Sequence, residues 1–363
     1  MRSSTLSRPE PRPGRVLLVD DSVVARAVLA RVVAQSERLE IAGAVPTAAA
    51  ALAFLADRRV DLIVLDIQMP GVDGLTALPD LLAAGRGAKV LIVSAAAGEG
   101  AAATVQALAL GAADTLVKPA PGERARRFEA ELIEKLERLL EPETAPQAPP
   151  PVRDLPPVRR PSPALIAPVS GDAFDVVAIG ASTGGIHALS QLLREVPATC
   201  RAPILVTQHL PTSFMPYFAT QLAVLANRPC EVATDRMRLR PGRIVIAPGD
   251  AHIRCVALSD GSVGVRLSTE YAASGCTPSV DPMFESAAEC YGPRALAVVL
   301  SGMGRDGAEG ARRVVASGGC VLAQDQASSA VWGMPGAVAG FATALLDPQA
   351  IGRVLASRRR PGC

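Results

Sequence analysis

Residues 175–185 read Asp-Val-Val-Ala-Ile-Gly-Ala-Ser-Thr-Gly-Gly, and they decide how the second half of the chain folds. The apolar run predicts a buried strand, and the small residues after it predict a sharp turn into a helix that begins near Ile186. Such a turn exposes the Ser182 hydroxyl and places the Thr183 backbone N–H at a helix N-terminus, where an oxyanion is stabilised. Ser182 is therefore the candidate nucleophile.

The same segment, taken alone, is equally compatible with a phosphate-binding turn of a dinucleotide fold, which also joins a strand to a helix through glycines. However, the G-x-G-x-x-G pattern is absent. The following strand, at 203–208, ends in His209 and not in an acidic residue. These two observations favour the nucleophile.

A serine needs a base that removes its proton, and the chain contains only three histidines. His209 follows the strand next to the Ser182 unit and can lie beside the turn. His187 lies in the first turn of the predicted helix, where a packing role is expected, and His252 follows a Pro-Gly-Asp turn and is expected to be structural, although it could line a pocket.

A third group must hold the imidazole in the correct tautomer, and Asp or Glu usually does so. Asp306 is the preferred candidate because its glycine-rich loop, 301–307, directly follows the apolar strand at 295–300. Asp281 is the competing candidate. Its setting, Ser279-Val-Asp281-Pro282, predicts instead that Asp281 caps a helix that has proline at its first position.

Apolar, β-branched runs alternate with helical segments on both sides of this unit. In the first half, strands are predicted at 16–19, 62–65, 90–93 and 115–117, and an amphipathic helix at 123–141 presents Phe128, Leu132, Leu136 and Leu139 on one face. In the second half they are predicted near 175–179, 203–208, 243–246, 295–300 and 320–323. The expected fold class is α/β, with two largely parallel sheets covered by helices.

Acidic residues follow two strands of the first half. Asp20 and Asp21 follow the first strand and Asp66 follows the third, so we expect the three carboxylates to meet at one edge of the sheet. Clustered carboxylates repel one another unless a cation lies among them, and Mg²⁺ fits this ligand type. Asp66 is the natural acceptor of a phosphoryl group, which Ser94 and Lys118 can contact.

The segment between the two halves, 142–172, contains ten prolines and predicts a linker. We expect a disordered arm at 1–14, a first domain at 15–141, a second domain at 173–354 and a basic tail at 355–363. The first fourteen residues do not resemble a secretory signal, and two long uncharged stretches are broken by Pro and Gly, so a cytoplasmic location without membrane insertion is expected.

The composition disfavours several classes of partner. The net charge is +2, and the few basic clusters carry no interleaved aromatic residues, so no nucleic-acid surface is expected. The seven cysteines are scattered through the second half without a C-x-x-C pair, which predicts reduced thiols and no zinc. No cofactor is expected in the second domain.

The motifs of the first half resemble the response-regulator receiver domain over 15–141. They are Asp20-Asp21, Leu65-Asp66-x-x-Met69-Pro70-Gly71-x-Asp73-Gly74, Ser94-Ala95 and Lys118-Pro119. The resemblance implies a flavodoxin-like sheet, phosphorylation of Asp66 by a histidine kinase, and Mg²⁺ held by Asp21, Asp66 and the Gln68 carbonyl. Thr115 stands where receivers usually carry an aromatic switch residue.

The second half resembles the chemotaxis protein-glutamate methylesterase family, CheB type. The segments that carry the likeness are 179–185, 208–211, 278–281, 301–307 and 333–335. The resemblance implies a catalytic triad of Ser182, His209 and Asp306, with an oxyanion site at the Thr183 and Met303 backbone N–H groups. It also implies that the enzyme removes methyl esters from chemoreceptor glutamates, releases methanol and deamidates receptor glutamines.

Two other hypotheses stay open at this stage. One keeps the chemistry but directs it to a non-chemotactic sensory array, since nothing in the sequence identifies the helix that enters the cleft. The other is a phosphorylation-dependent binding module without catalysis, against which the intact triad argues.

Overall fold

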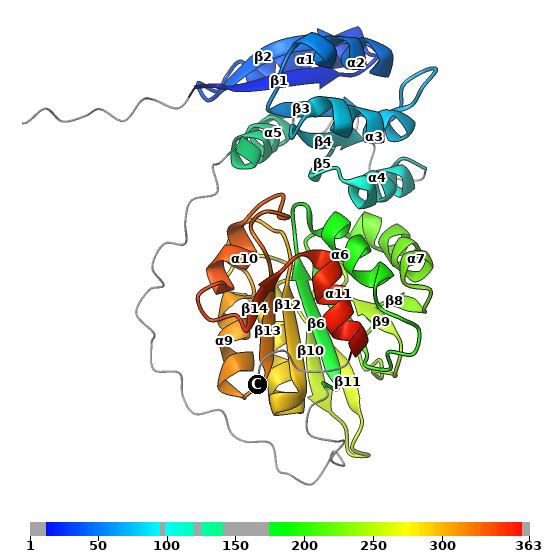
Figure 1. Ribbon diagram of the computed structural model, residues 1–363, viewed down its shortest axis with the longest axis vertical. Coiled ribbons are helices and arrows are strands. Elements are labelled where there is room, and N and C mark those ends of the chain that lie inside the picture. The colour runs from blue at the N-terminus through cyan, green and yellow to red at the C-terminus, as the bar shows by residue number, and fades with distance from the viewer. Residues whose placement is uncertain (1–11, 95–98, 120–124, 141–173, 358–363) are drawn as a thin grey trace, which may run out of the picture. The chain divides into compact units, whose positions relative to one another are not determined.

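The computed structural model describes residues 12–94, 99–119, 125–140 and 174–357, and the chain forms two compact units, which Figure 1 shows as ribbons. The linker predicted at 142–172, and most of the predicted arm and tail, lie outside the described residues.

The first sheet has five strands in the order β2-β1-β3-β4-β5. This is the flavodoxin-like order that the sequence predicts. The pairs of β1 with β2, β1 with β3 and β3 with β4 are parallel. The strands are β1 (Gly14–Val19), β2 (Leu39–Val45), β3 (Leu62–Asp66), β4 (Lys89–Ser94) and β5 (Asp114–Val117).

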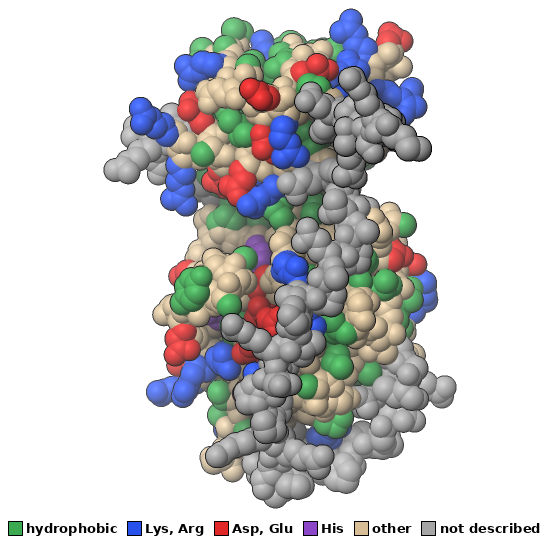
Figure 2. All heavy atoms as spheres, turned by 90° about the vertical axis from the view of Figure 1, so that its left-hand side faces the viewer, with side chains coloured by type: hydrophobic (Ala, Val, Ile, Leu, Met, Phe, Trp, Pro, Cys, Tyr) green, Lys and Arg blue, Asp and Glu red, His purple; other side chains and the backbone are tan. Residues whose placement is uncertain are grey.

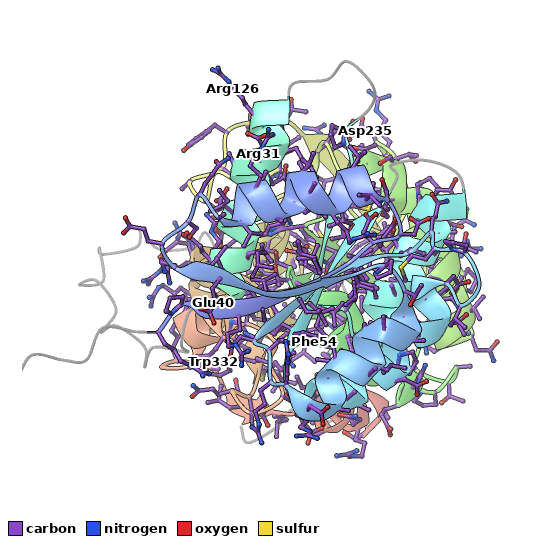
Figure 3. The ribbon with its side chains drawn as sticks, turned by 90° about the horizontal axis from the view of Figure 1, so that it is seen from above. Arg31, Glu40, Phe54, Arg126, Asp235 and Trp332 are labelled. Atoms are coloured by element: carbon purple, nitrogen blue, oxygen red, sulfur yellow. The ribbon has the colours of Figure 1, made fainter. Side chains whose placement is uncertain are left out.

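Helices cover both faces of this sheet. They are α1 (Val23–Val33), α2 (Ala48–Asp57), α3 (Gly74–Gly85), α4 (Glu99–Leu110) and α5 (Ala125–Leu140). Helix α1 packs with α5 and α2 packs with α3; Figure 3 shows α1, marked by Arg31, and α2, marked by Phe54, on opposite sides of the sheet. Leu132, Leu136 and Leu139 of α5 are buried, as their spacing predicts.

The second sheet has seven strands in the order β14-β13-β12-β6-β7-β9-β8, and every pair is parallel. The strands are β6 (Val176–Ala181), β7 (Ile204–Gln208), β8 (Cys230–Val232), β9 (Ile244–Ile246), β12 (Ala295–Val299), β13 (Cys320–Gln324) and β14 (Ala344–Leu346). All residues of β6, β7 and β12 are buried, which explains why these strands are apolar apart from Thr207 and Gln208 at the end of β7.

Two groups of helices flank this sheet (Figure 1). Helix α6 (Gly185–Arg194) packs with α7 (Met215–Ala226) and α11 (Pro348–Ser357), while α8 (Val280–Tyr291) packs with α9 (Ala308–Ala316), which contacts α10 (Gly333–Val338). An antiparallel hairpin of β10 (His252–Ala257) and β11 (Val263–Ser268) packs on α8. Two 3-10 turns, at Thr212–Phe214 and Gly292–Arg294, complete the described elements.

The α/β fold class is confirmed, and the predicted strands match observed ones to within about two residues. Strands β2, β8, β10, β11 and β14 were not located from the sequence. None of the helices in the described ranges is long and apolar enough to cross a membrane. Figure 2 shows basic and acidic side chains interspersed on the face that it presents, so no field of a single sign covers that face.

Candidate functional site

The acidic residues of the first unit lie at the carboxyl edge of its sheet. Val19 pairs with Leu65, and Asp66 pairs with Val93, so the chain leaves β1, β3 and β4 at the same level. Carboxylate oxygens of Asp20, Asp21 and Asp66 lie within 4.8 Å of one another. The structure therefore brings the three predicted carboxylates together.

Lys118 completes this cluster from the end of β5. Its Nζ donates to Asp66 Oδ2 at 2.7 Å and to Asp20 Oδ2 at 3.2 Å. Burial raises the pKa of Asp66 above its usual value, although Lys118 opposes this effect. Burial opposes the charged form of Lys118, but its contacts with Asp66 and Asp20 outweigh burial and raise its pKa.

The loop after β3 is tightly constrained around Asp66. The Gln68 N–H donates to Asp66 Oδ1 at 3.2 Å, and the Gly74 N–H donates to the Ile67 carbonyl at 2.9 Å. A Cβ on Gly74 would lie 2.2 Å from the Asp66 carbonyl oxygen, so no side chain fits there. Asp73 caps α3, because its Oδ1 accepts the Thr76 N–H at 2.7 Å.

The donor set of this cluster fits Mg²⁺. Asp20 and Asp66 are buried, Asp21 is exposed, and hard carboxylate oxygens are the ligands that this ion prefers. A divalent cation would offset the repulsion that a single lysine leaves uncompensated. Ser94, at the buried end of β4, lies at the same edge of the sheet, and Thr115 lies in β5 three positions before Lys118.

In the second unit, Ser182 and His209 follow neighbouring parallel strands. Ala181 pairs with Gln208, and the His209 N–H donates to the Ala181 carbonyl at 3.1 Å. Ser182 and His209 are thus next to each other at the carboxyl edge of the sheet, as expected from the strand ends. On the other side, the Ser182 N–H donates to the Ser301 carbonyl at 3.1 Å, so the loop of Asp306 borders the same point.

His209 and Asp306 form a hydrogen-bonded pair. His209 Nε2 lies 2.8 Å from Asp306 Oδ2. An ionised carboxylate only accepts hydrogen bonds, so Nε2 carries the proton and Nδ1 is the nitrogen that can take one. Burial opposes charge on the ring, but Asp306 and Cys276 outweigh it and raise the pKa of His209 to about 9.

Asp306 is held by more than the imidazole. The Ser279 hydroxyl donates to its Oδ1 at 2.6 Å, and the Val280 N–H donates to its Oδ2 at 2.8 Å. Burial alone would raise the pKa of Asp306, but these donors and His209 together lower it. The carboxylate therefore stays ionised in a buried position and can orient the ring.

The two loops that carry the predicted oxyanion donors, Thr183 and Met303, are joined through Ser301. The Ser301 hydroxyl donates to the Thr183 carbonyl at 2.8 Å and accepts the Val331 N–H at 3.0 Å. The Ser301 N–H donates to Gln324 Oε1 at 2.7 Å. Rigid placement of backbone N–H groups is what oxyanion stabilisation requires.

The competing acid, Asp281, lies in the first turn of α8 but is not its N-cap. Ser279 is the N-cap of α8, so the prediction that Asp281 caps the helix is wrong. Asp281 Oδ1 accepts the Gly310 N–H at 2.7 Å, and burial raises the pKa of Asp281 to about 7. The helix therefore begins two residues earlier than predicted. The Ser279 hydroxyl and the Val280 N–H at this start both donate to Asp306.

The other histidines have partners outside this pair. His252 is buried; its Nδ1 accepts the Ser279 N–H at 2.8 Å, and its Nε2 lies 2.8 Å from the Glu270 carbonyl. His187 Nε2 lies 2.8 Å from the Gln191 side-chain nitrogen on the same helix. His252 thus fixes the loop before α8, which places Ser279.

Sequence reasoning missed three residues of this site: Ser279, Ser301 and Cys276. Ser279 orients Asp306, Ser301 joins the two loops, and Cys276 lies beside His209 and Asp306. The signal for Ser279 was present, since it stands two residues before the competing Asp281 at a predicted helix start. Cys276 carries no comparable signal, because its loop has no periodic pattern.

Comparisons with known proteins give a match for each half of the chain. Residues 16–127 match the family described as response regulator receiver domain, and residues 177–355 match the family described as CheB methylesterase. A relative from Bradyrhizobium diazoefficiens, named protein-glutamate methylesterase/protein-glutamine glutaminase of group 2 operon, is 40% identical over 96% of this chain and 95% of its own length.

A second relative, from Caulobacter vibrioides, is named protein-glutamate methylesterase/protein-glutamine glutaminase 2. It is 40% identical over 95% of this chain and 99% of its own length. Among solved structures, the Thermotoga maritima CheB methylesterase catalytic domain is 36% identical and covers 52% of this chain and 99% of that one, with a TM-score of 0.49.

Proposed function

The chain belongs to the CheB methylesterase family with an N-terminal receiver domain, and from this premise we propose that it is a phosphorylation-activated protein-glutamate methylesterase and protein-glutamine glutaminase. The observation that carries the proposal is the bond of 2.8 Å between His209 Nε2 and Asp306 Oδ2, at the strand edge where Ser182 also lies. We assign Ser182 as nucleophile, His209 as base and Asp306 as the orienting group.

The first half of the reaction uses these groups in order. His209 Nδ1 takes the proton of Ser182 while Oγ attacks the γ-carbonyl of a methylated glutamate. The backbone N–H groups of Thr183 and Met303 stabilise the tetrahedral oxyanion. As the intermediate collapses, the imidazolium returns the proton to the leaving oxygen, and methanol departs.

The second half repeats the chemistry with water. His209 removes a proton from a water molecule that attacks the acyl-enzyme, and Ser182 leaves with that proton. A glutamine side chain follows the same path and releases ammonia. Throughout, Asp306 keeps its charge because Ser279 and Val280 hold it, so it stabilises the imidazolium that forms in each step.

We propose that the receiver domain spans 15–141 and the linker 142–172, with an arm before them. The predicted boundary at 354 falls inside α11, which runs to Ser357 and buries Leu355, so we propose a catalytic domain at 173–357 and a basic tail at 358–363. Asp66 would receive a phosphoryl group from a histidine kinase. Asp20, Asp21, Asp66 and the Gln68 carbonyl would hold Mg²⁺, which neutralises phosphoryl oxygens when bound. Lys118 and Ser94 would contact the phosphoryl group and transmit its presence.

The substrate would be a chemoreceptor helix, because the named activity of the relatives is on protein glutamate and glutamine side chains. Such helices and the kinase lie in the cytoplasm, which is the location we propose. No nucleic-acid partner or membrane insertion is part of this proposal.

The decisive experiment measures methanol release from methylated receptor membranes with the Ser182→Ala variant. We expect a loss of roughly 10⁴-fold or more, because attack requires the hydroxyl. Ser190→Ala is the matched control: this serine is buried on α6 and donates only to the Ile186 carbonyl, at 2.8 Å. Methanol release retained by Ser182→Ala would contradict the assignment.

The regulatory half is tested separately with Asp66→Asn. A small-molecule phosphodonor with Mg²⁺ should stimulate the wild-type enzyme and leave Asp66→Asn at its basal rate, while Ser182→Ala should still incorporate phosphate. Deleting the receiver should raise basal hydrolysis if the receiver inhibits it. Stimulation that persists in Asp66→Asn would reject Asp66 as the phosphorylated residue.

A further inference from the structure

Cys276 brings a thiol to the catalytic pair although the proposed reaction does not use it. One ligand atom each of His209, Cys276 and Asp306 lies within 4.8 Å of the other two. In the described ranges this is one of two clusters of three metal-ligating side chains; the other is the acidic cluster of the first unit. Cys276 is only half-buried, which leaves its thiol open to approach.

The loop between β11 and α8 holds Cys276 in place. The Cys276 N–H donates to the Ser274 hydroxyl at 3.3 Å, and that hydroxyl lies 3.1 Å from the Ser279 hydroxyl. Ser279 in turn donates to Asp306. The Cys276 backbone and the Asp306 carboxylate are thus linked through the hydroxyls of Ser274 and Ser279.

The three ligand types match a particular class of ion. An imidazole nitrogen, a thiolate and a carboxylate are all ligands of Zn²⁺, with bonds of about 2.0 to 2.3 Å. Around a tetrahedral ion such ligand atoms are about 3.3 to 3.8 Å apart. Atoms at the observed limit of 4.8 Å would close by about 1 Å, whereas His209 Nε2 and Asp306 Oδ2, which are 2.8 Å apart, would separate by about 0.5 Å if both bound the ion. Three protein ligands leave the fourth position for water or for Ser182 Oγ.

We propose that His209, Cys276 and Asp306 form an inhibitory site for Zn²⁺ or a similar thiophilic divalent ion. Binding releases the thiol proton and uses one imidazole nitrogen as a ligand. A ring bound through Nε2 keeps its remaining proton on Nδ1, and a ring bound through Nδ1 has no lone pair left. In either case His209 no longer accepts the Ser182 proton, so hydrolysis stops. This consequence rests on the proposed function; the binding itself does not.

The sequence gives no zinc signal because the ligands are far apart in it. His209, Cys276 and Asp306 come from three different loops, and no pair has the short spacing of a zinc motif. The two clusters of the chain also differ in ligand chemistry. Oxygen ligands alone suit Mg²⁺ in the first unit, whereas a thiolate selects a softer ion in the second.

The experiment uses the full chain and two readouts, of which one is independent of catalysis. Titration with Co²⁺ as a spectroscopic substitute should give one bound ion with a thiolate-to-metal charge-transfer band, and Zn²⁺ should displace it. Micromolar Zn²⁺ should lower methanol release at least tenfold, and EDTA should restore it. In Cys276→Ser, the band should vanish, and the Zn²⁺ concentration that halves the variant's own metal-free rate should rise at least tenfold over the wild-type value.

Cys230→Ser is the matched control, because Cys230 is also a half-buried free thiol but lies in β8, outside both clusters. It should keep the band and the inhibition. The proposal is overturned if Cys276→Ser remains as sensitive to Zn²⁺ as the wild type, if no thiolate band forms, or if EDTA fails to restore activity. Failure of the proposed function would instead appear as no methanol release in any sample, with the Co²⁺ band still present.

Discussion

Asp66 and Asp306 are both buried carboxylates at the carboxyl edge of a parallel sheet, yet their surroundings act on them in opposite ways. Burial raises the pKa of Asp66, which shares Lys118 with Asp20. At Asp306 the same burial is outweighed by the donors of Ser279, Val280 and His209, and the pKa falls. Asp306 is therefore built to remain charged.

The difference corresponds to what each carboxylate does. In the proposed function, Asp66 changes its charge when it receives a phosphoryl group, and an incompletely compensated site favours a cation and a reacting partner. In the same proposal, Asp306 keeps its charge through both halves of hydrolysis, and its fixed donors stabilise that charge. Substitutions at each site test whether the two carboxylates differ in this way.

The largest effect is expected for Asp306→Asn. The amide cannot hold the imidazole in the tautomer that leaves Nδ1 free to accept a proton, so kcat should fall roughly 10⁴-fold. Asp281→Asn is the matched control: the pKa of Asp281 is raised to about 7, and an amide oxygen can still accept the Gly310 N–H, so kcat should change less than about threefold. Steady-state methanol release measures both. Equal losses of kcat in the two variants would show that Asp306 is not the residue that orients His209.

Some strands of the two sheets can be predicted from the sequence and others cannot. Buried strands such as Leu62–Asp66 and Val176–Ala181 are continuous apolar runs, so both strand ends and the residues after them could be placed. Strand Leu39–Val45 was missed because Ala and Gly interrupt it, and the hairpin β10–β11 because it interrupts the βα alternation.

The residues of the candidate site likewise fall into a group that the sequence predicts and a group that it does not. Ser182, His209 and Asp306 all follow strands that the sequence reveals, so their convergence could be predicted. Ser279 and Cys276 lie before α8 in a loop that only tertiary contacts position. His252 fixes this loop, and its partner is 27 residues away in the chain. No local pattern encodes such a contact.

The next effect concerns how closely Ser182 is packed. A Cβ on Gly302 would lie 2.3 Å from Met334 Sδ, 2.9 Å from Ser182 Cβ and 3.1 Å from the Ser182 backbone nitrogen, so Gly302→Ala displaces Met334 and crowds the nucleophile. A shift of about 1 Å at a reacting atom can lower kcat about 100-fold. Gly340→Ala is the control, because a Cβ there meets nothing within 4 Å. Phosphorylation of Asp66 should be the same in both variants, and an unaffected kcat in Gly302→Ala would disprove the close contact.

A smaller effect is expected from pH. Since His209 must be neutral to act as base and its pKa is raised to about 9, kcat/KM should rise about tenfold per pH unit between pH 7 and pH 8. Rates measured in EDTA at fixed ionic strength test this. His187→Gln should keep the same rise, because His187 Nε2 contacts Gln191 on its own helix and not the pair. If kcat/KM instead levels off above a pKa near the ordinary imidazole value of 6.5, Asp306 and Cys276 do not stabilise the charged ring.

The smallest effect, a few degrees in Tm, tests the opposite pKa directions directly. A carboxylate whose pKa is raised by folding contributes stability below pH 3.8 that is lost as the pH rises through its folded pKa, so ionised Asp66 costs stability at pH 7. The lowered pKa of Asp306 gives stability that is present above pH 3.8 and lost as the pH falls through its folded pKa. In EDTA at pH 7, Asp66→Asn should therefore stabilise its unit and Asp306→Asn should destabilise its own.

The two units can be followed separately in the full chain. Trp332 is the single tryptophan and belongs to the second unit, so its fluorescence reports that unit's unfolding, while hydrogen exchange of peptides from β1 and β3 reports the first. Asp306→Asn should lower the Tm seen by Trp332 and leave exchange in β1 and β3 unchanged; Asp66→Asn should slow that exchange and leave the Trp332 transition in place. Shifts of the same sign in both variants would mean that the two carboxylates do not differ in the way their hydrogen bonds indicate.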